Sequence, residues 1–236
     1  MNYQTTFKRY ELKYLLTPAQ KALILQVMQP HMALDRYGRT AIRNIYFDTE
    51  NFRLIRRSLE KPAYKEKLRI RSYRAVGPCD DVFVELKKKY RSVVYKRRLV
   101  LPQNTAISCF RTGTSLPVHS QIASEIDYFR SYYQPLFPTV FLSYEREAYA
   151  PLEDGDFRVT FDENILYRTH HFSLSSELRG TPLLSPGQTL MELKTSGGIP
   201  LWMSHALTVG KIYQTSFSKY GSAYQNLLAQ GGIQYA

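Results

Sequence analysis

The sequence predicts an α+β protein: a mainly antiparallel, closed β-barrel of about eight strands, which forms a tunnel with a polar, basic lumen and is covered outside by amphipathic helices. Three observations predict this fold. Short β-rich segments are joined by tight turns, charged side chains recur at every second position of these segments, and four other segments have the apolar period of a helix. Because no repeat or linker interrupts the chain, we expect residues 1–236 to form a single domain.

Eight segments have the β-rich pattern. The first spans residues 8–15, and the others follow at 41–48, 65–73, 82–89, 95–101, 140–148, 157–167 and 190–195. Sequences dense in Gly, Pro, Asp and Ser separate several of them, for example at 76–81 and 150–156. Short connections join antiparallel neighbours, so the sheet is expected to be mainly antiparallel.

Apolar residues three and four positions apart predict four helices. Thr17 is expected to cap the first, with Pro18 in its first turn. The second begins near residue 50. The apolar stripes of the last three helices are, in order, Phe52, Ile55 and Leu59; Ile122, Ile126, Phe129 and Tyr133; and Tyr220, Ala223, Tyr224 and Leu227.

Cationic side chains share one face of the predicted strands. In KLRIRSY, Lys67, Arg69 and Arg71 alternate with apolar residues. The same alternation groups Glu85 with Lys87 and Lys89, Lys96 with Arg98, Tyr144 with Arg146, Arg158 with Thr160 and Asp162, and Glu192 with Lys194.

This face could simply be the solvated side of an antiparallel sheet. However, like charges opposed across strands repel each other, so a mostly cationic face persists most easily when a polyanion neutralises it. Inside a barrel, the cations would line a tunnel for a thin linear polyanion. A nucleic-acid duplex would not enter such a tunnel.

The composition agrees with an anionic partner. The 32 basic and 20 acidic residues give a formal charge of +12. No apolar run is long enough to span a membrane, the first residues lack a signal peptide, and two cysteines cannot form a disulfide framework. We therefore expect a cytoplasmic chain without a membrane span.

The few carboxylates on the cationic face require a reason, because an unpaired glutamate beside a phosphate is repulsive. A divalent cation, Mg²⁺ or Mn²⁺, supplies one, since it commonly bridges carboxylates to substrate phosphates. Glu192 and Glu11 are the preferred ligands, with Glu85 behind them. A salt bridge to Lys87 or Arg69 would explain Glu85 without a metal. A metal with an Arg/Lys clamp is a sufficient set for phosphoryl transfer.

The set of motifs resembles a known family. IYFDTENFRLIRRSLEK (45–61), then KLRIRSY, VFVELKKK, a YxR, an ExK strand and a C-terminal SFSKYG are similar to the catalytic domain of the vacuolar transporter chaperone (VTC) family of polyphosphate polymerases. That family belongs to the CYTH-like triphosphate tunnel metalloenzymes. The opening RYELKY is similar to the ExExK signature of the superfamily, with Arg9 in place of the first glutamate, a departure usual for the VTC branch.

The resemblance implies roles for individual residues. It assigns phosphate binding in catalysis to Lys13, Arg69, Arg71, Lys87, Lys96, Arg146, Arg158 and Lys219, with Tyr144 and Ser218 assisting, and metal binding to Glu192. Lys194, Arg98 and Lys89 join the substrate-binding set through their strand positions. Ser218 and Lys219 are expected to begin the last helix, where backbone N–H groups favour an anion, although a simple helix cap also explains Ser218.

Three functions follow. The first, implied by the resemblance, is a metal-dependent polyphosphate polymerase that transfers the γ-phosphate of ATP onto a growing chain and releases ADP. The second is a triphosphate or polyphosphate hydrolase that uses the same tunnel. The third is a non-catalytic binder of polyphosphate, inositol phosphates or nucleic acid. ATP and inorganic polyphosphate are the expected partners, and a separate membrane-protein partner, which would hold the chain peripherally at the membrane, remains open.

Overall fold

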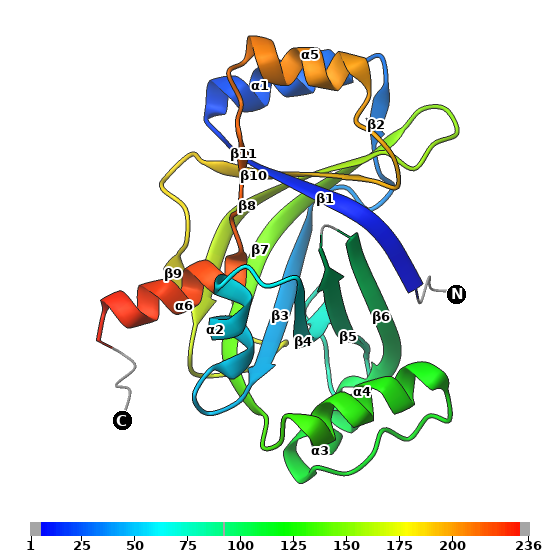
Figure 1. The fold of residues 1–236 in the computed structure, drawn as a ribbon, viewed down its shortest axis with the longest axis vertical. Coiled ribbons are helices and arrows are strands. Elements are labelled where there is room, and N and C mark those ends of the chain that lie inside the picture. Colours follow the sequence, from blue (N-terminus) through cyan, green and yellow to red (C-terminus); the bar gives the residue numbers. More distant parts are fainter. Residues whose placement is uncertain (1–5, 92, 232–236) are drawn as a thin grey trace.

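A computed structural model describes residues 6–91 and 93–231 as one curled antiparallel sheet with helices packed against it (Figure 1). The long strands are β1 (Thr6–Leu16), β3 (Thr40–Asp48), β4 (Tyr64–Ser72), β5 (Asp81–Tyr90), β6 (Val93–Pro102), β7 (Phe137–Pro151), β8 (Arg158–Arg168) and β10 (Thr189–Thr195). The short strands are β2 (Met32–Leu34), β9 (Thr181–Pro182) and β11 (Gln214–Thr215). Each of the eight predicted strands is therefore present, within a few residues of its expected bounds.

The prediction of a closed eight-stranded barrel is confirmed only in part. The sheet has eleven strands, because β2, β9 and β11 add to β7, β8 and β1. The eight long strands pair in the order β7-β3-β4-β5-β6-β1-β10-β8, and β8 pairs with β7. Hydrogen bonds do not close the wall along its length: β1 and β6 pair only between residues 6–9 and 94–97, after which β1 follows β10. The wall is thus open beyond that short contact.

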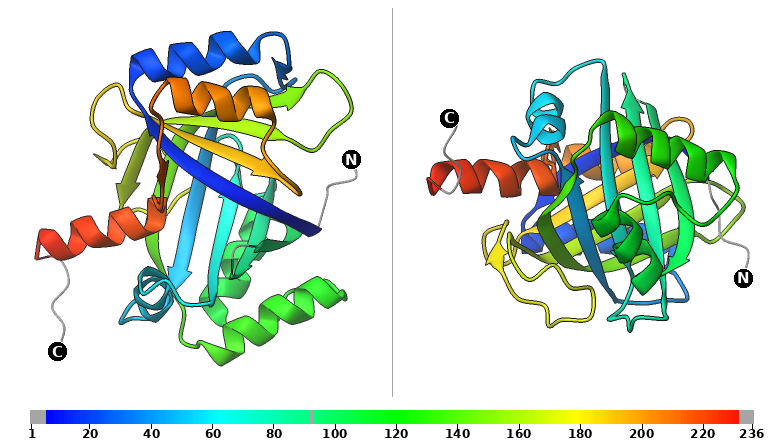
Figure 2. Two further views of the ribbon diagram at one scale, coloured as in Figure 1. Left: turned by 45° about the horizontal axis from the view of Figure 1, so that its top comes forward. Right: turned by 90° about the horizontal axis from the view of Figure 1, so that it is seen from below.

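Within the residues that the structure describes, six helices pack around the sheet (Figure 2). They are α1 (Pro18–Met28), α2 (Arg53–Leu59), α3 (Gln103–Thr112), α4 (Gln121–Tyr132), α5 (Leu201–Val209) and α6 (Lys219–Ala229). α1, α2, α4 and α6 are the four predicted helices, and α3 and α5 were not predicted. The sequence of α5, LWMSHALTV, is apolar nearly all round, so its periodicity is weak, and packing against α1 stabilises it.

The apolar side chains at alternate positions of the strands face these helices, as expected. Leu68, Ile70, Val84 and Leu86 pack with residues of α3 and α4. On another part of the same outer surface, Met191 and Leu193 of β10 pack with residues of α1 and α5. Each such side chain contributes about 1.5–3 kcal/mol when fully buried. Because neighbouring residues of a strand point to opposite faces, burial of the apolar side chains under the helices directs the cationic side chains inward.

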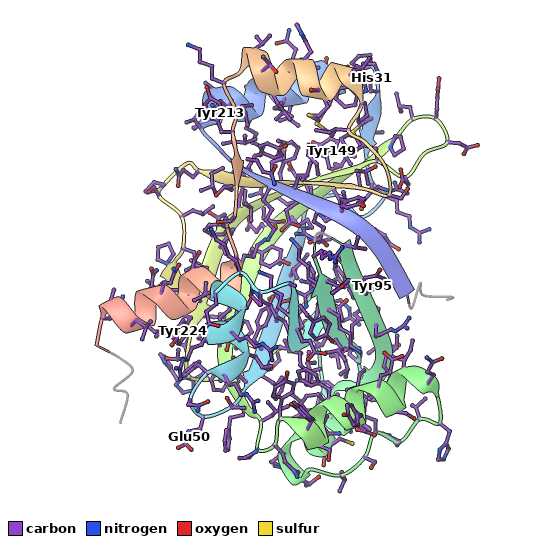
Figure 3. All side chains as sticks on the ribbon, viewed as in Figure 1. His31, Glu50, Tyr95, Tyr149, Tyr213 and Tyr224 are labelled. Atoms are coloured by element: carbon purple, nitrogen blue, oxygen red, sulfur yellow. The ribbon has the colours of Figure 1, made fainter. Side chains whose placement is uncertain are left out.

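The lumen is not cationic throughout, which corrects the expectation of a basic tunnel. Ile42 and Leu142 share the inward face of their strands with Tyr46 and Tyr144, yet all four belong to an apolar cluster that includes residues of α2 and α6. Tyr224, labelled in Figure 3, contacts Phe52 with ring centroids 5.3 Å apart. One side of the interior is therefore filled by side chains, and the open space lies along β4, β5, β1 and β10.

Local hydrogen bonds place the helix beginnings. Thr17 and Gln20 form a capping box at α1, as predicted for Thr17. The carboxylate of Asp48 accepts hydrogen bonds from the backbone N–H groups of Leu54 and Ile55 in α2 (2.8 and 3.0 Å) and from the Tyr220 hydroxyl (2.9 Å). Asp48 thus joins the end of β3 to both α2 and α6.

Candidate functional site

A cavity of about 870 Å³ occupies the open part of the interior. Its walls come from β4, β5, β6, β1, β10 and β7, and from the segment 214–220 that leads into α6. The predicted site residues among its lining are Glu11, Lys13, Arg69, Arg71, Lys87, Lys89, Lys96, Tyr144, Arg146, Glu192, Lys194, Ser218 and Lys219. The fold therefore brings together side chains from six strands; alternation predicted those on β4, β5, β6, β7 and β10, whereas Glu11, Lys13, Ser218 and Lys219 were predicted on other grounds.

Three predicted residues do not line this cavity: Glu85, Arg98 and Arg158. Glu85 and Arg98 are buried in the wall behind it. Arg158 is exposed at the first position of β8, although it lies opposite Lys194 in register. Alternation predicts the face on which a side chain lies, but at a strand end that face can open to solvent.

Glu85 is a fully buried counter-ion for arginines. Its Oε2 accepts a hydrogen bond from Arg69 Nε at 2.8 Å, and its Oε1 accepts one from Arg98 Nε at 2.8 Å; the Nη2 atoms of the same arginines form ion pairs with these oxygens at 2.7 and 2.6 Å. Burial alone would raise the pKa of Glu85, but Arg69 and the other surrounding cations hold it well below its usual range. Both oxygens are occupied by guanidinium groups, so Glu85 does not fit the metal role considered for it and is a structural salt bridge instead.

Glu192 is surrounded more loosely. Its Oε1 lies 3.5 Å from Lys13 Nζ and 3.3 Å from Lys219 Nζ, and its Oε2 lies 3.0 Å from Lys194 Nζ. Arg146 Nη2 approaches the same Oε2 at 3.4 Å. Burial would raise the pKa of Glu192, yet these cations keep it well below the usual value, so the carboxylate is ionised. It borders the cavity, where another cation can reach it.

Asp162 is a site residue that the sequence analysis placed on the inward face but gave no role. It is fully buried and bonds both Arg146 and Lys219. Burial lowers the pKa of a lysine, but Asp162 and Glu192 outweigh it and raise the pKa of Lys219. Asp162 therefore keeps Lys219 charged at the start of α6, where Ser218 caps the helix by accepting from Gly221 N.

Two tyrosines orient the arginines of the wall. The Tyr46 hydroxyl accepts from Arg69 Nη1 at 2.8 Å, and the Tyr144 hydroxyl accepts from Arg71 Nη2 at 2.9 Å. Tyr46 also stacks on Tyr220, with ring centroids 4.8 Å apart. Tyr46 was missed by the sequence analysis, because an aromatic residue in a strand gives no signal that separates an orienting role from packing.

Several lysines of the cavity have lowered pKa values, chiefly because burial disfavours the charged form. Burial lowers the pKa of Lys96 to about 6 and that of Lys194 to about 8. Burial, with the neighbouring Lys13 and Lys87, also puts the pKa of Lys67 well below its usual range. A bound anion would reverse these shifts, because it favours the protonated ammonium group.

Lys65 and Lys67 line the cavity as well. The sequence analysis did not include them among the site residues, although they share the parity of Arg69 and Arg71. Lys67 Nζ donates to Ser218 Oγ at 2.8 Å, and Lys13 Nζ donates to Phe217 O at 3.0 Å. These two lysines thereby tie the strand wall to the beginning of α6.

The carboxylates of Glu11 and Glu192 fit a metal ion only when substrate phosphates supply further ligands. Within residues 6–91 and 93–231, no group of three His, Cys, Asp or Glu side chains could hold an ion by itself. Glu11 and Glu192 are diagonal neighbours on β1 and β10 and face the same cavity. Burial would raise the pKa of Glu11, but Lys87, whose Nζ lies 2.6 Å from its Oε2, lowers it, so both carboxylates are ionised. Two ionised carboxylates suit Mg²⁺ or Mn²⁺ when substrate phosphates complete the ligand set.

The helices of the described part of the chain are all too short or too polar to cross a bilayer.

Comparisons with known proteins agree with this fold. The chain is similar to a candidate adenylate cyclase of Bacillus halodurans at 19% identity and a TM-score of 0.56, covering 91% of this chain and 96% of that one. It is also similar to a candidate adenylyl cyclase of Hippeastrum, described as having a dominant triphosphatase activity, at 14% identity and a TM-score of 0.56, over 96% and 97% of the two chains. A search of the curated proteins finds no match. At these identities the two likenesses concern the fold alone.

The sequence itself matches the VTC domain over residues 8–228, a span that includes every residue lining the cavity. The fold is that of the CYTH-like triphosphate tunnel proteins, as the resemblance implied. This chain therefore belongs to the VTC domain family.

Proposed function

We propose that this chain is a metal-dependent polyphosphate polymerase, which transfers the γ-phosphate of ATP onto the end of a growing polyphosphate chain. One observation carries the proposal: a single cavity of about 870 Å³ collects arginines and lysines from six strands around two ionised carboxylates, Glu11 and Glu192. Such a lining suits a linear polyanion together with a divalent cation. Membership of the VTC domain family supports the same substrate class.

In this proposal the terminal oxygen of the chain attacks the γ-phosphorus of ATP. A bond forms between that oxygen and the phosphorus, the bond to the β–γ bridging oxygen breaks, and ADP leaves with the electron pair. Phosphoryl transfer needs mainly positioning and charge stabilisation, so no side chain must form a covalent intermediate. The reaction lengthens the polyphosphate chain by one phosphate unit.

In this proposal arginines, lysines and glutamates have different roles. Arg69, Arg71 and Arg146 present planar donors held in place by buried acceptors, which suits fixed phosphate oxygens. Lys13, Lys87, Lys194 and Lys219 present ammonium groups around them, and Lys96, whose pKa burial lowers to about 6, would gain its proton when phosphate binds. Glu192 and Glu11 would hold Mn²⁺ or Mg²⁺, which supplies neutralisation of phosphate charge when bound.

The direct experiment incubates the purified chain with ATP and Mn²⁺ and separates the products. Release of ADP together with long-chain polyphosphate is the expected result. Release of free orthophosphate without polymer would instead identify a hydrolase, which the same clamp permits. Absence of any ADP and any phosphate product would contradict both enzymatic assignments and leave the protein as a binder.

A matched pair of variants connects the result to the cavity. Lys219→Met removes a cation at the cavity wall, and Arg111→Met removes an exposed cation from α3, outside the cavity. Lys219→Met should lower the rate of ADP release at least about tenfold, since the lost charge–phosphate contact is worth more than about 1.4 kcal/mol. Arg111→Met should leave that rate within about twofold. Equal rates for the two variants would mean that the reaction does not occur in this cavity.

A further inference from the structure

The guanidinium of Arg71 is held in the cavity wall by uncharged acceptors. Its Nε donates to Asn44 Oδ1 at 2.7 Å, and its Nη2 donates to the Tyr144 hydroxyl at 2.9 Å. Arg71 and both acceptors are buried, although the Arg71 side chain still borders the cavity. The two hydrogen bonds therefore fix the plane of this guanidinium without placing a negative charge against it.

Arg69 and Arg146 also line the cavity, but each of them pairs directly with a buried carboxylate. Arg69 donates to Glu85, and Arg146 donates to Asp162. Glu85 Oε2 lies 3.8 Å from Arg71 Nε, which is beyond hydrogen-bond length, and the same oxygen already accepts from Arg69. The charge of Arg71 is therefore less compensated than the charges of the other two arginines.

Sheet register gives Asn44 its place beside Arg71. Asn44 lies on β3, directly opposite Arg71 on β4 and directly opposite Leu142 on β7. Its Nδ2 donates to Leu142 O at 3.0 Å, while its Oδ1 accepts from Arg71. The Asn44 side chain is fully buried, so these two partners set the orientation of the carboxamide. Asn44 thus connects the guanidinium to the backbone of a strand on the other side of β3.

A carboxamide suits this position because it donates and accepts at the same time. A carboxylate here would accept from Arg71, but it would face Leu142 O without a proton to donate. It would also compensate the charge of Arg71 at hydrogen-bond distance. An apolar side chain would remove the acceptor of a buried guanidinium N–H, which is costly. An uncharged acceptor orients the guanidinium and preserves its charge.

We propose that Asn44 is a positioning residue, which directs the Arg71 guanidinium into the cavity and leaves its charge available to a substrate phosphate. This inference rests on the proposed function for its ligand and deepens it. Arg69 and Arg146 contribute donors whose charge a carboxylate already shares, whereas Arg71 contributes the least compensated guanidinium of the three. Asn44 itself lies behind Arg71 and does not line the cavity.

Two substitutions separate the orientation of Arg71 from its charge. Asn44→Asp keeps the acceptor and adds a negative charge, whereas Asn44→Ser removes the carboxamide and adds no charge. The control is Asn104→Asp, which adds the same charge at an exposed position of α3, outside the cavity. Calorimetry measures the affinity for tripolyphosphate, ADP release gives kcat and KM, and denaturant unfolding shows whether each variant is folded.

We expect Asn44→Asp to weaken tripolyphosphate binding at least about tenfold, because the new carboxylate pairs with Arg71 and repels the phosphates. Asn44→Ser should weaken binding less than about threefold, since the charge of Arg71 remains. It should nevertheless lower kcat about tenfold, because the guanidinium is no longer held in place. Asn104→Asp should change each quantity less than about twofold. A side chain with a purely structural role would not separate affinity from kcat in this way.

Every other outcome overturns a stated claim. Wild-type affinity in Asn44→Asp would show that the charge of Arg71 does not bind phosphate, and wild-type kcat in Asn44→Ser would show that Asn44 does not position it. An equal loss in Asn104→Asp would reduce the effect to net charge. If neither Asn44 variant unfolds cooperatively, the role of Asn44 is structural and the inference fails.

The wild-type protein separates this inference from the proposed function. If it binds no tripolyphosphate and releases no ADP, the proposed function fails and this inference fails with it. If it does both and the two Asn44 variants match it, this inference alone fails.

Discussion

Two buried glutamates of the strand wall, Glu85 on β5 and Glu192 on β10, carry the same charge in different surroundings. Glu85 accepts a hydrogen bond of 2.8 Å from the Nε of Arg69 and another from the Nε of Arg98, and the Nη2 atoms of both arginines lie 2.6–2.7 Å from it as ion pairs. Glu192 has three lysines and Arg146 at 3.0–3.5 Å. Short bonds from rigid arginines make a fixed structural unit, whereas longer contacts from flexible lysines leave a carboxylate that can exchange partners.

The difference shows how a cationic cavity can remain folded without its ligand. The Glu85 cluster neutralises and orients the arginines that border the cavity. The Glu192 cluster, by contrast, consists of longer contacts with lysines, which phosphate and a metal would displace in the proposed function. We therefore expect replacement of Glu85 to affect mainly the stability of the protein, and replacement of Glu192 to affect mainly its activity.

The largest expected effect is on stability, from Glu85→Gln. Removing this charge takes away the buried counter-ion that Arg69 and Arg98 share, which should lower the free energy of unfolding by about 3–5 kcal/mol. Denaturant unfolding followed by circular dichroism measures it. A loss below about 1 kcal/mol would mean that Glu85 is not the structural member of the pair.

Glu192→Gln should act mainly on activity. We expect ADP release to fall by about two orders of magnitude, because the proposed metal loses a charged ligand. The concentration of Mn²⁺ that gives half-maximal rate should rise in parallel. Glu85→Gln, assayed at a temperature where it remains folded, is the matched comparison, and a normal metal requirement in Glu192→Gln would remove the metal role.

The lowered pKa of Lys96 predicts that the affinity for tripolyphosphate depends on pH. Burial lowers its pKa to about 6 in the ligand-free protein, so it is mostly neutral at pH 7, and a bound phosphate raises that pKa. Binding therefore takes up a proton between pH 6 and the raised pKa, and affinity falls as pH rises through this window, by at most about tenfold per pH unit. Calorimetry of tripolyphosphate binding in buffers of different ionisation enthalpy measures this uptake.

Lys96→Arg is the control for that measurement. Arginine stays protonated throughout the range, so the variant should bind tripolyphosphate with a smaller proton uptake while keeping the positive charge. An uptake equal to that of the wild-type protein would assign the titration to other lysines of the cavity.

The smallest effect is expected from Arg158. Since this side chain is exposed at a strand end and does not line the cavity, Arg158→Gln should change the rate of ADP release less than about threefold. Arg146→Gln, which removes the cavity-lining partner of Asp162 and Glu192, should lower the rate far more. Equal effects would mean that Arg158 reaches the bound chain after all.

The parity of charged residues predicted much of this site. Lys87, Arg69 and Glu192 were placed on the inward face by alternation alone, and the structure brings them to one cavity. Alternation is a local property of an extended chain, so it survives into the folded state whenever the other face is covered by helices. It also points to Lys65 and Lys67, which the analysis left out of the site.

The division of roles among those residues could not be predicted in this way. Whether Glu85 or Glu192 remains available to a ligand depends on Arg98 and Lys13, which come from other strands of the sheet. The role of Tyr46 depends on both Arg69 and Tyr220, which is 174 positions later in the chain. None of these partnerships leaves a pattern in a single strand.

The amino-acid sequence by itself determined which strands form, which side of each carries charge, and that the whole carries a large positive excess, because these properties depend on residues adjacent along the chain. Only the tertiary structure decided that one side of the interior is filled by tyrosines and aliphatic residues from α2, α6 and the facing strands, and which cations pair with the buried carboxylates Glu85, Asp162 and Glu192. Those outcomes depend on distances between segments far apart in sequence, and in a low-dielectric interior such distances decide whether a charge is fixed or free to meet a ligand.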